Sequence, residues 1–219
     1  MQSGDAEIVV AGERLVLLPE RAVLWPRAGT LLVADTHFGK AAAFRAGGLP
    51  VPGGTTAEGL ARLDRALDRT GAGRVVFLGD FLHARQGRAP ATFQSLGEWQ
   101  RRRATVDLVL VRGNHDRGAG DPPKEMQIRC VDPPLLEAPF VLAHHPDPAP
   151  HGYVLAGHVH PAVLLTGRGR QRARLPCFWF GAWGAVLPAF GGFTGVAEVA
   201  PAAGDRVFVV ADGEVVEVS

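Results

Sequence analysis

The stretch LVLVRGNHD, residues 108–116, joins an apolar run to a cluster of polar residues. Four consecutive apolar residues predict a strand that is covered on both faces, as in a parallel sheet. The run then ends at once in Arg112, Gly113, Asn114, His115 and Asp116. Ligands of open α/β sheets bind at the carboxyl ends of strands, so this stretch indicates a functional site.

Four other apolar runs end in the same way. Each is followed at once by Asp or His: LLVA-Asp35-Thr36-His37, VFLG-Asp80, FVLA-His144-His145 and VLAG-His158-Val159-His160. Helical patterns at 55–71 and 90–104 separate the first three strands, which predicts right-handed crossovers and a largely parallel sheet. The polar groups are therefore expected to converge on one edge of that sheet.

The ends of the chain indicate antiparallel strands. Residues 7–19 and 21–26 suit two short strands, and residues 205–218 predict a hairpin that turns at Asp212-Gly213. These strands extend the central sheet to a mixed or double sheet of the α/β class. With 219 residues, we expect one domain that spans 1–219.

Composition and charge narrow the class of protein. A hydrophobic content of 47% and a charged content of 21% are ordinary for a soluble globular protein. The net charge of +1 gives no global basic field, so any nucleic-acid surface must be local. Cys130 and Cys177 form no CxxC pair, the first residues have no apolar leader pattern, and no run is long enough to span a bilayer. We expect a cytoplasmic protein that does not associate with a membrane.

The residue types at the strand ends favour divalent metal chemistry. Asp, Asn and neutral His supply oxygen and imidazole ligands without a thiolate, which suits Mn, Fe, Ni or Zn. Seven such groups exceed the needs of one ion but suit two ions that share a carboxylate. Paired ions of this kind clamp the attacking and leaving oxygens of a phosphoryl centre.

Each residue alone also has an ordinary structural interpretation. Asp35 or Asp80 could cap a helix, His144 could be a hydrogen-bonded core histidine, and Gly113-Asn114 favours a turn. Five coincidences, one at each strand end, would be needed to explain the whole pattern in this way. We therefore favour the metal site.

The ordered set of motifs resembles the calcineurin-like metallophosphoesterase superfamily. It comprises D-x-H, G-D, G-N-H-D, a strand-terminal histidine and G-H-x-H, at residues 35–37, 79–80, 113–116, 144 and 157–160. The resemblance implies a four-layer αββα sandwich, in which two mixed β-sheets are flanked by helices. It also implies hydrolysis of phosphate esters at a dinuclear metal centre.

Carried over position by position, the resemblance implies two ligand sets that share Asp80. The first ion is expected on Asp35, His37, Asp80 and His160. The second is expected on Asp80, Asn114, His144 and His158. His145 competes with His144 for the ligand role, and we favour His144 because it comes first after the strand.

The same resemblance assigns catalytic roles around the loop at 113–116. His115 is expected to be the catalytic acid, with Asn114 and Asp80 as the other catalytic residues, and Asp116 is expected to fix the loop. Many phosphatases of the superfamily read G-D-x-x-D, where the second Asp orients the catalytic histidine. Here that position is His83, which could contact the substrate or His115, or simply lie at the surface.

Longer stretches resemble a narrower group, the ligase-associated DNA-damage-response endonucleases (PdeM). These stretches are residues 33–56, 77–85, 110–117 and 174–195. The resemblance implies manganese-supported cleavage of DNA phosphodiesters, a role in DNA repair, and a functional association with a DNA ligase and a helicase-like protein.

Basic residues near the motifs are candidate phosphate contacts. Lys40 and Arg117, with His83, are the expected substrate-binding residues, and Arg45 is a further candidate. Four alternating arginines, Arg168, Arg170, Arg172 and Arg174, would share one face of an extended segment and suit backbone phosphates, or would form a solvated hairpin tip. In CFWF, residues 177–180, base stacking is possible, but core packing of Phe178 and Phe180 is favoured.

The same residues permit other functions. A phosphomonoesterase, a nucleotide pyrophosphatase or a cyclic-nucleotide phosphodiesterase that acts on small substrates would use a similar centre. A binding scaffold with a decayed site is a further alternative. Missing ligands would mark that case, and none of the seven positions is missing.

Overall fold

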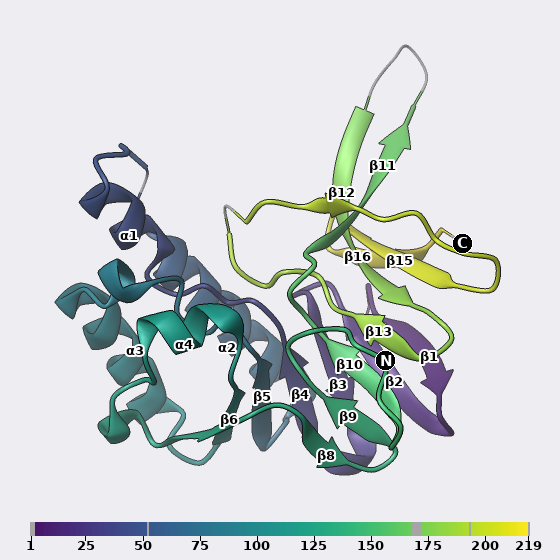
Figure 1. Cartoon of the computed structure of the whole chain (residues 1–219), viewed down its shortest axis with the longest axis horizontal. Helices are drawn as coiled ribbons and strands as arrows, with labels where there is room; N and C mark the ends of the chain where they lie inside the picture. The colour runs from purple at the N-terminus through teal and green to yellow at the C-terminus, as the bar shows by residue number, and fades with distance from the viewer. Residues whose placement is uncertain (1–2, 52, 168–171, 193, 219) are drawn as a thin grey trace.

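The computed structural model describes residues 3–51, 53–167, 172–192 and 194–218, and Figure 1 shows a helical layer beside two β-sheets. The first sheet follows chain order. Its strands are β1 (Ala6–Val10), β2 (Glu13–Leu18), β3 (Ala22–Trp25), β4 (Thr30–Val33), β5 (Arg74–Leu78), β6 (Asp107–Val111) and β7 (Ile128–Val131). The pairs from β1 to β4 are antiparallel, and those from β4 to β7 are parallel.

The first part of this sheet corrects one prediction. Residues 7–19 form two strands rather than one, because the chain reverses at Ala11 and Gly12, both at positive φ (50° and 77°). Glycine adopts this left-handed conformation readily, and the turn links β1 to β2. The amino-terminal region therefore contributes three antiparallel strands.

The second sheet is also mixed. Its strands are β8 (Leu135–Glu137), β9 (Phe140–Leu142), β10 (Tyr153–Ala156), β11 (Pro161–Thr166), β12 (Arg172–Phe180), β13 (Gly184–Val186), β14 (Ala197–Glu198), β15 (Arg206–Ala211) and β16 (Glu214–Glu217). β9, β10 and β13 are parallel neighbours, whereas β15 and β16 form the predicted hairpin with Asp212 and Gly213 at positive φ. The β11–β12 hairpin projects from the body of the molecule (Figure 1).

The α-helices of the described residues lie on the outer face of the first sheet. They are α1 (Lys40–Ala46), α2 (Thr55–Thr70), α3 (Pro90–Arg102) and α4 (Asn114–Ala119), with short 3-10 turns at Pro26–Ala28, Arg85–Gly87 and Lys124–Met126. Leu60, Leu63 and Leu67 form the buried stripe of α2, which ends at Gly71 as expected. Among these helices none is long and apolar enough to cross a bilayer.

A second core lies between the two sheets. Leu32, Val76 and Val109 of the first sheet share one apolar cluster with Phe178 and Phe180 of the second. Both phenylalanines are buried, which confirms the core interpretation of residues 177–180, and Trp179 faces the other way and donates to Asp205 Oδ2 at 2.7 Å. The expected mixed α/β fold with two mixed sheets and helices is confirmed, but among the described residues the helices cover only the first sheet, so the expected helical layer on the second sheet is not formed.

The five strand ends belong to two sheets, not to one as the sequence suggested. β4, β5 and β6 are parallel neighbours in the first sheet, whereas β9 and β10 are parallel neighbours in the second. The two sheets are linked at this end, because Ala34 bridges Ala189 and accepts the N–H of Phe190 at 2.9 Å. The polar groups therefore meet across the interface between the sheets.

Candidate metal centre

The backbone curls sharply where the strands end. Five of the seven candidate ligands have positive φ: Asp35 (54°), His37 (46°), Asp80 (51°), His158 (68°) and His160 (54°). Asp and His adopt this left-handed region more readily than most side chains, but it still costs of order 1–3 kcal/mol per residue. Such residues cluster at functional sites, where the surrounding structure holds them in place.

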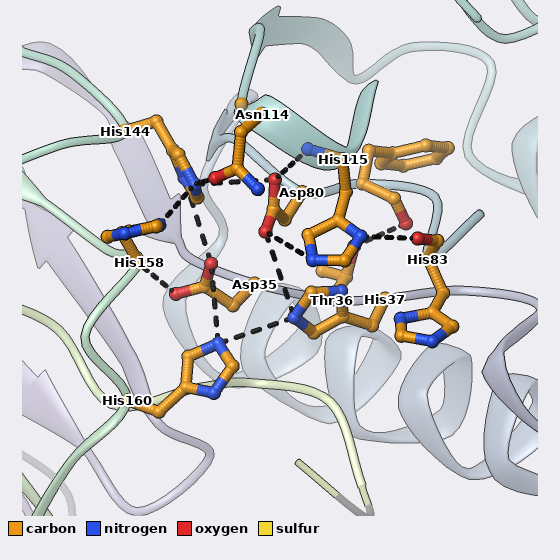
Figure 2. Close-up of polar contacts among 12 residues, drawn as sticks. Asp35, Thr36, His37, Asp80, His83, Asn114, His115, His144, His158 and His160 are labelled. Carbon is orange, nitrogen blue, oxygen red and sulfur yellow. Dashed lines mark hydrogen bonds and ion pairs between the residues drawn. The ribbon is translucent and has the colours of Figure 1, made fainter. Parts of the chain in front are cut away.

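The first predicted ligand set is assembled around His37 (Figure 2). Its Nε2 lies 3.3 Å from Nε2 of His160 and 3.9 Å from Oδ2 of Asp80. Nε2 of His160 lies 3.7 Å from Oδ1 of Asp35. Asp35, His37 and His160 thus offer ligand atoms within 4.8 Å of one another.

The second predicted set is assembled around His144. Its Nε2 lies 2.9 Å from Oδ1 of Asn114, 3.1 Å from Nδ1 of His158 and 3.3 Å from Oδ1 of Asp80. Asp80 therefore directs Oδ1 toward this set and Oδ2 toward the first. The structure brings all seven candidate ligands together, with this carboxylate between the two sets (Figure 2).

The facing atoms are almost all hydrogen-bond acceptors. His144 Nδ1 donates to the Leu78 carbonyl at 3.0 Å and His160 Nδ1 donates to the Gly195 carbonyl at 2.9 Å, so the Nε2 atoms of both rings carry lone pairs. Oδ1 of Asp35, which faces Nε2 of His160, is buried without a hydrogen-bond partner among the described residues. A cluster of facing lone pairs is costly unless a cation lies among them, so the donor set fits divalent ions.

Burial keeps these ligand groups in a suitable protonation state. It lowers the pKa of His37 to about 2, with the charge of Lys40 as the next cause, and lowers the pKa of His144 to about 4. Both imidazoles are therefore neutral at pH 7 and able to bind a cation. Burial also raises the pKa of Asp80, and a cation beside the carboxylate would reverse that effect.

The stability of the metal-free protein is expected to fall in acid partly because of His144, and His37 acts in the same sense because burial lowers its pKa as well. The folded state holds the pKa of His144 near 4 against an ordinary value of 6.5, so the unfolded chain binds more protons and stability falls as the pH drops through this range. Burial raises the pKa of Asp116 to about 6, which acts in the opposite sense. We expect the melting temperature of chelator-treated His144→Asn to fall less between pH 6.5 and 4.5 than that of the wild type. An equal fall in melting temperature for the variant and the wild type would contradict the assignment of this pH dependence to His144.

His145 is less well placed than His144. His144 is fully buried and contacts Asp80 and Asn114, whereas His145 is exposed and its ring lies 4.0 Å from that of His158. His144, His145 and His158 also offer ligand atoms close to one another. The contacts with Asp80 and Asn114 nevertheless favour His144 over His145 as the ligand of the second set.

The absence of a side chain at Gly113 makes room for the centre. A Cβ at this position would collide with Oδ1 of Asp80 and would lie 3.0 Å from Cγ of His144. A Gly113→Ala variant should therefore displace the shared carboxylate and lower the rate of a reaction catalysed at this centre by about 100-fold or more. The bound metal should fall in parallel, as measured by elemental analysis after gel filtration. Full metal content with wild-type activity would contradict the close packing.

Asp116 supports the loop that carries Asn114 and His115. It is buried, and its carboxylate accepts the N–H groups of Gly113 at 2.8 Å and of Leu82 at 3.2 Å. The Gly113 bond belongs to a capping box at the start of α4. These contacts match the expected loop-fixing role, because both carboxylate oxygens are engaged by backbone.

His115 lies at the open side of the centre. Its Nδ1 donates to the carbonyl of His83 at 2.6 Å, its Nε2 lies 3.9 Å from Oδ2 of Asp80, and its side chain is 40% exposed. A hollow of about 300 Å³ beside it is lined partly by His83, Asn114 and His115. Nε2 is therefore the ring atom that can exchange a proton with a bound molecule.

His83 orients His115 through its backbone rather than through its imidazole. The two rings are stacked with centroids 5.2 Å apart, and burial, with smaller effects of Lys40 and His115, lowers the pKa of His83 to about 4. The sequence did not reveal this role, because a backbone carbonyl has no residue signature. The same is true of the carbonyls of Leu78 and Gly195.

The candidate phosphate contacts differ in position. Lys40 is buried, with Nζ 5.6 Å from the centre of the Phe44 ring, and its charge acts on His37 and His83. Arg117 is exposed on α4, and no hydrogen bond or ion pair among the described residues brings its side chain to the centre. Arg45 lines a separate hollow between α1, α2 and α3. Arg172 and Arg174 are exposed on β12, whereas Arg168 and Arg170 lie outside the described residues.

Comparison with protein families then identifies the class. A family model for the calcineurin-like phosphoesterases matches residues 30–152, which carry most of the candidate ligands. The chain belongs to the calcineurin-like phosphoesterase family. It is therefore a hydrolase that acts on phosphoester bonds, in a family that uses divalent metals.

Solved structures extend the comparison. A nuclease called MPE from Pseudomonas putida is 44% identical to this phosphoesterase, with a TM-score of 0.87 over 98% of this chain and 100% of that one. Yfce, a phosphoesterase from E. coli, is 16% identical over 86% of this chain and 97% of its own, with a TM-score of 0.41. No curated protein sequence matches the chain.

Proposed function

We propose that this phosphoesterase hydrolyses DNA phosphodiester bonds at two divalent metal ions. The binding of two metal ions is supported by the position of Asp80, whose two oxygens face two separate groups of ligand atoms. The DNA part is supported by the 44% identity to a nuclease over nearly the whole chain. Manganese is the proposed metal, with iron, zinc or nickel as the alternatives that the ligand set also suits.

The proposed ligand sets are those that the family resemblance implies. Asp35, His37 and His160 hold one ion, Asn114, His144 and His158 hold the other, and Asp80 contributes to both. When bound, the ions activate a water for attack on phosphorus and stabilise negative charge on the phosphate oxygens. The carbonyls of Leu78 and Gly195 hold the ligand imidazoles in the correct tautomer.

His115 supplies the proton that the leaving oxygen requires. The carbonyl of His83 accepts a hydrogen bond from the Nδ1–H of His115 and holds the ring so that Nε2 donates at the open side of the centre. Asn114 and Asp80 complete the catalytic group, since the Asp80 carboxylate accepts the backbone N–H of His115 at 2.9 Å and fixes its position. The side chains of Lys40, His83 and Arg117 contact the substrate in this proposal.

A substrate panel separates this function from its alternatives. Bis-p-nitrophenyl phosphate, p-nitrophenyl phosphate, a nucleotide pyrophosphate, a cyclic nucleotide and a DNA oligonucleotide are each incubated with metal-free protein to which Mn, Fe, Zn, Ni or Mg is added. The proposal predicts that DNA and the diester are cleaved and that manganese supports the highest rate. Preference for the monoester, for a nucleotide pyrophosphate or for the cyclic nucleotide would indicate a small-molecule phosphoesterase instead.

The broader setting is also part of the proposal. The motif resemblance supports a role in DNA repair, in functional association with a DNA ligase and a helicase-like protein, and the cysteine pattern supports a location in the cytoplasm. Residues 1–219 are proposed to act as one domain, because the two sheets share a common core. A single cooperative unfolding transition in calorimetry would support the proposal that residues 1–219 form one domain.

A further inference from the structure

A second hollow, of about 290 Å³, lies beside the candidate metal centre and is rich in arginine. Its lining includes Arg21 from the turn between β2 and β3, Arg62 from α2 and Arg174 from β12, together with His160. We call it the arginine pocket. Elements from both sheets and from the helical layer therefore supply its positive charge.

The loop after β13 forms a common wall between this pocket and the metal centre. Gly191 lines the pocket and its N–H donates to the Asp35 carbonyl at 3.0 Å. His160 belongs to both places, since it lines the pocket and its Nε2 faces Oδ1 of Asp35. A ligand in the pocket would therefore lie next to the first ligand set.

Among the described residues, carboxylates offset the positive charge of the pocket only in part. No ion pair joins Arg21 or Arg62 to a carboxylate among the described residues; instead, Arg21 donates to the Ala189 carbonyl at 3.4 Å and Arg62 donates to that of Phe190. Burial lowers the pKa of Arg62, an effect that the charges of Glu58 and Glu20 only partly offset. Burial, with the charge of Arg62 as the second cause, lowers the pKa of Arg21 to about 10. Two half-buried guanidiniums without a counter-ion favour the binding of an anion.

We propose that the arginine pocket binds a backbone phosphate of the DNA strand, adjacent to the phosphate that is hydrolysed. This inference rests on the proposed DNA substrate. Guanidinium groups bind phosphate oxygens in pairs of parallel hydrogen bonds, and here two such groups converge on one hollow. The pocket then accounts for a preference for a polynucleotide over any substrate with a single phosphate.

The arginines beyond the pocket favour an internal phosphate over a terminal one. Arg174 lines the pocket and Arg172 lies two residues along β12, so the two share one face of the strand and both are exposed. They continue the positive surface along the β11–β12 hairpin, which projects outward (Figure 1). A strand seated in the pocket can therefore continue along the hairpin.

The test compares two substrates in one double variant, Arg21→Gln with Arg62→Gln. Its kcat/KM for a DNA oligonucleotide should fall by about tenfold or more, because the variant lacks two charged donors to a phosphate. Hydrolysis of bis-p-nitrophenyl phosphate, which has one phosphate, should change much less. The matched control is Arg129→Gln, which removes an exposed arginine from β7 at the other edge of the first sheet and should cleave DNA as the wild type does.

Two further measurements separate phosphate binding from a structural role. A plot of log KM for the oligonucleotide against log salt concentration should be less steep for the double variant than for the wild type. Its slope should decrease by about 0.7 for each phosphate of a single strand that the variant no longer binds. A purely structural role, through the hydrogen bonds of Arg21 and Arg62 to the carbonyls of Ala189 and Phe190, would lower the melting temperature but leave the salt dependence of KM unchanged. An equal reduction on both substrates, or an unchanged salt slope, would overturn the inference.

The remaining outcomes distinguish the possible errors. Oligonucleotides with and without terminal phosphates should be affected equally; an effect confined to those with a terminal phosphate would overturn the internal site in favour of end recognition. If the wild type hydrolyses bis-p-nitrophenyl phosphate but no DNA, the proposed substrate fails and this inference fails with it. If the wild type and the double variant cleave DNA equally, only the arginine pocket is refuted.

Discussion

Replacing Asp80 with asparagine is expected to reduce phosphodiester hydrolysis by about 1000-fold or more, whichever metal is supplied. The two carboxylate oxygens of Asp80 face the two ligand sets, so the loss of Asp80 weakens both metal positions at once. Asparagine has nearly the same shape but lacks the negative charge that holds two cations close together. Lewis-acid stabilisation by metal ions contributes several kcal/mol to such reactions, and about 1.36 kcal/mol corresponds to a factor of ten.

Elemental analysis is the matching measurement. Wild-type protein that is reconstituted with manganese should retain about two ions per chain, and Asp80→Asn clearly fewer. The control is Asp132→Asn, which removes a carboxylate that is 84% exposed and pairs with Arg112 on the surface. Undiminished metal content together with wild-type turnover in the Asp80 variant would refute the shared-ligand role.

The second large effect is expected from His115→Ala, which should lower DNA cleavage by about 10²–10⁴-fold while metal content stays the same. The ring contributes Nε2 at the open side of the centre, and the carbonyl of His83 holds it in place. A p-nitrophenolate leaves without help from an acid more readily than a sugar alkoxide does. The reduction on bis-p-nitrophenyl phosphate should therefore be clearly smaller than the reduction on DNA.

This difference between substrates identifies proton donation. An equal reduction on both substrates would instead indicate that His115 stabilises charge or binds the phosphate. His151→Ala is the control, because His151 is exposed and lies outside the two ligand sets. Loss of bound metal from His115→Ala would contradict the claim that His115 is not a metal ligand.

The strand ends could be predicted because their signal is local. An apolar run followed by Asp, Asn or His is visible within ten residues, and the parallel order of β4, β5 and β6 follows from the helices between them. The division into two sheets could not be predicted in this way. It depends on β10 pairing with β13 rather than with β6, and such pairing is decided by packing across the core between the sheets.

The arginine pocket lay beyond sequence analysis for a similar reason. Arg21 and Arg62 come from a strand turn and a helix that carry no metal motif, and a loop far along the chain joins them to Asp35. The arginines around residue 170 are conspicuous in the sequence because they alternate with other residues. Arg21 and Arg62 could be recognised only from their proximity in three dimensions and from the lack of a paired carboxylate among the described residues.

The central claim is that Asp80 lies between two metal ions, and crystals grown with manganese test it most directly. The account predicts two anomalous difference peaks about 3.5–4 Å apart. One should lie against Asp35, His37 and His160, the other against Asn114, His144 and His158, and both against the carboxylate of Asp80. A single peak, or two peaks of which only one touches Asp80, would contradict the account.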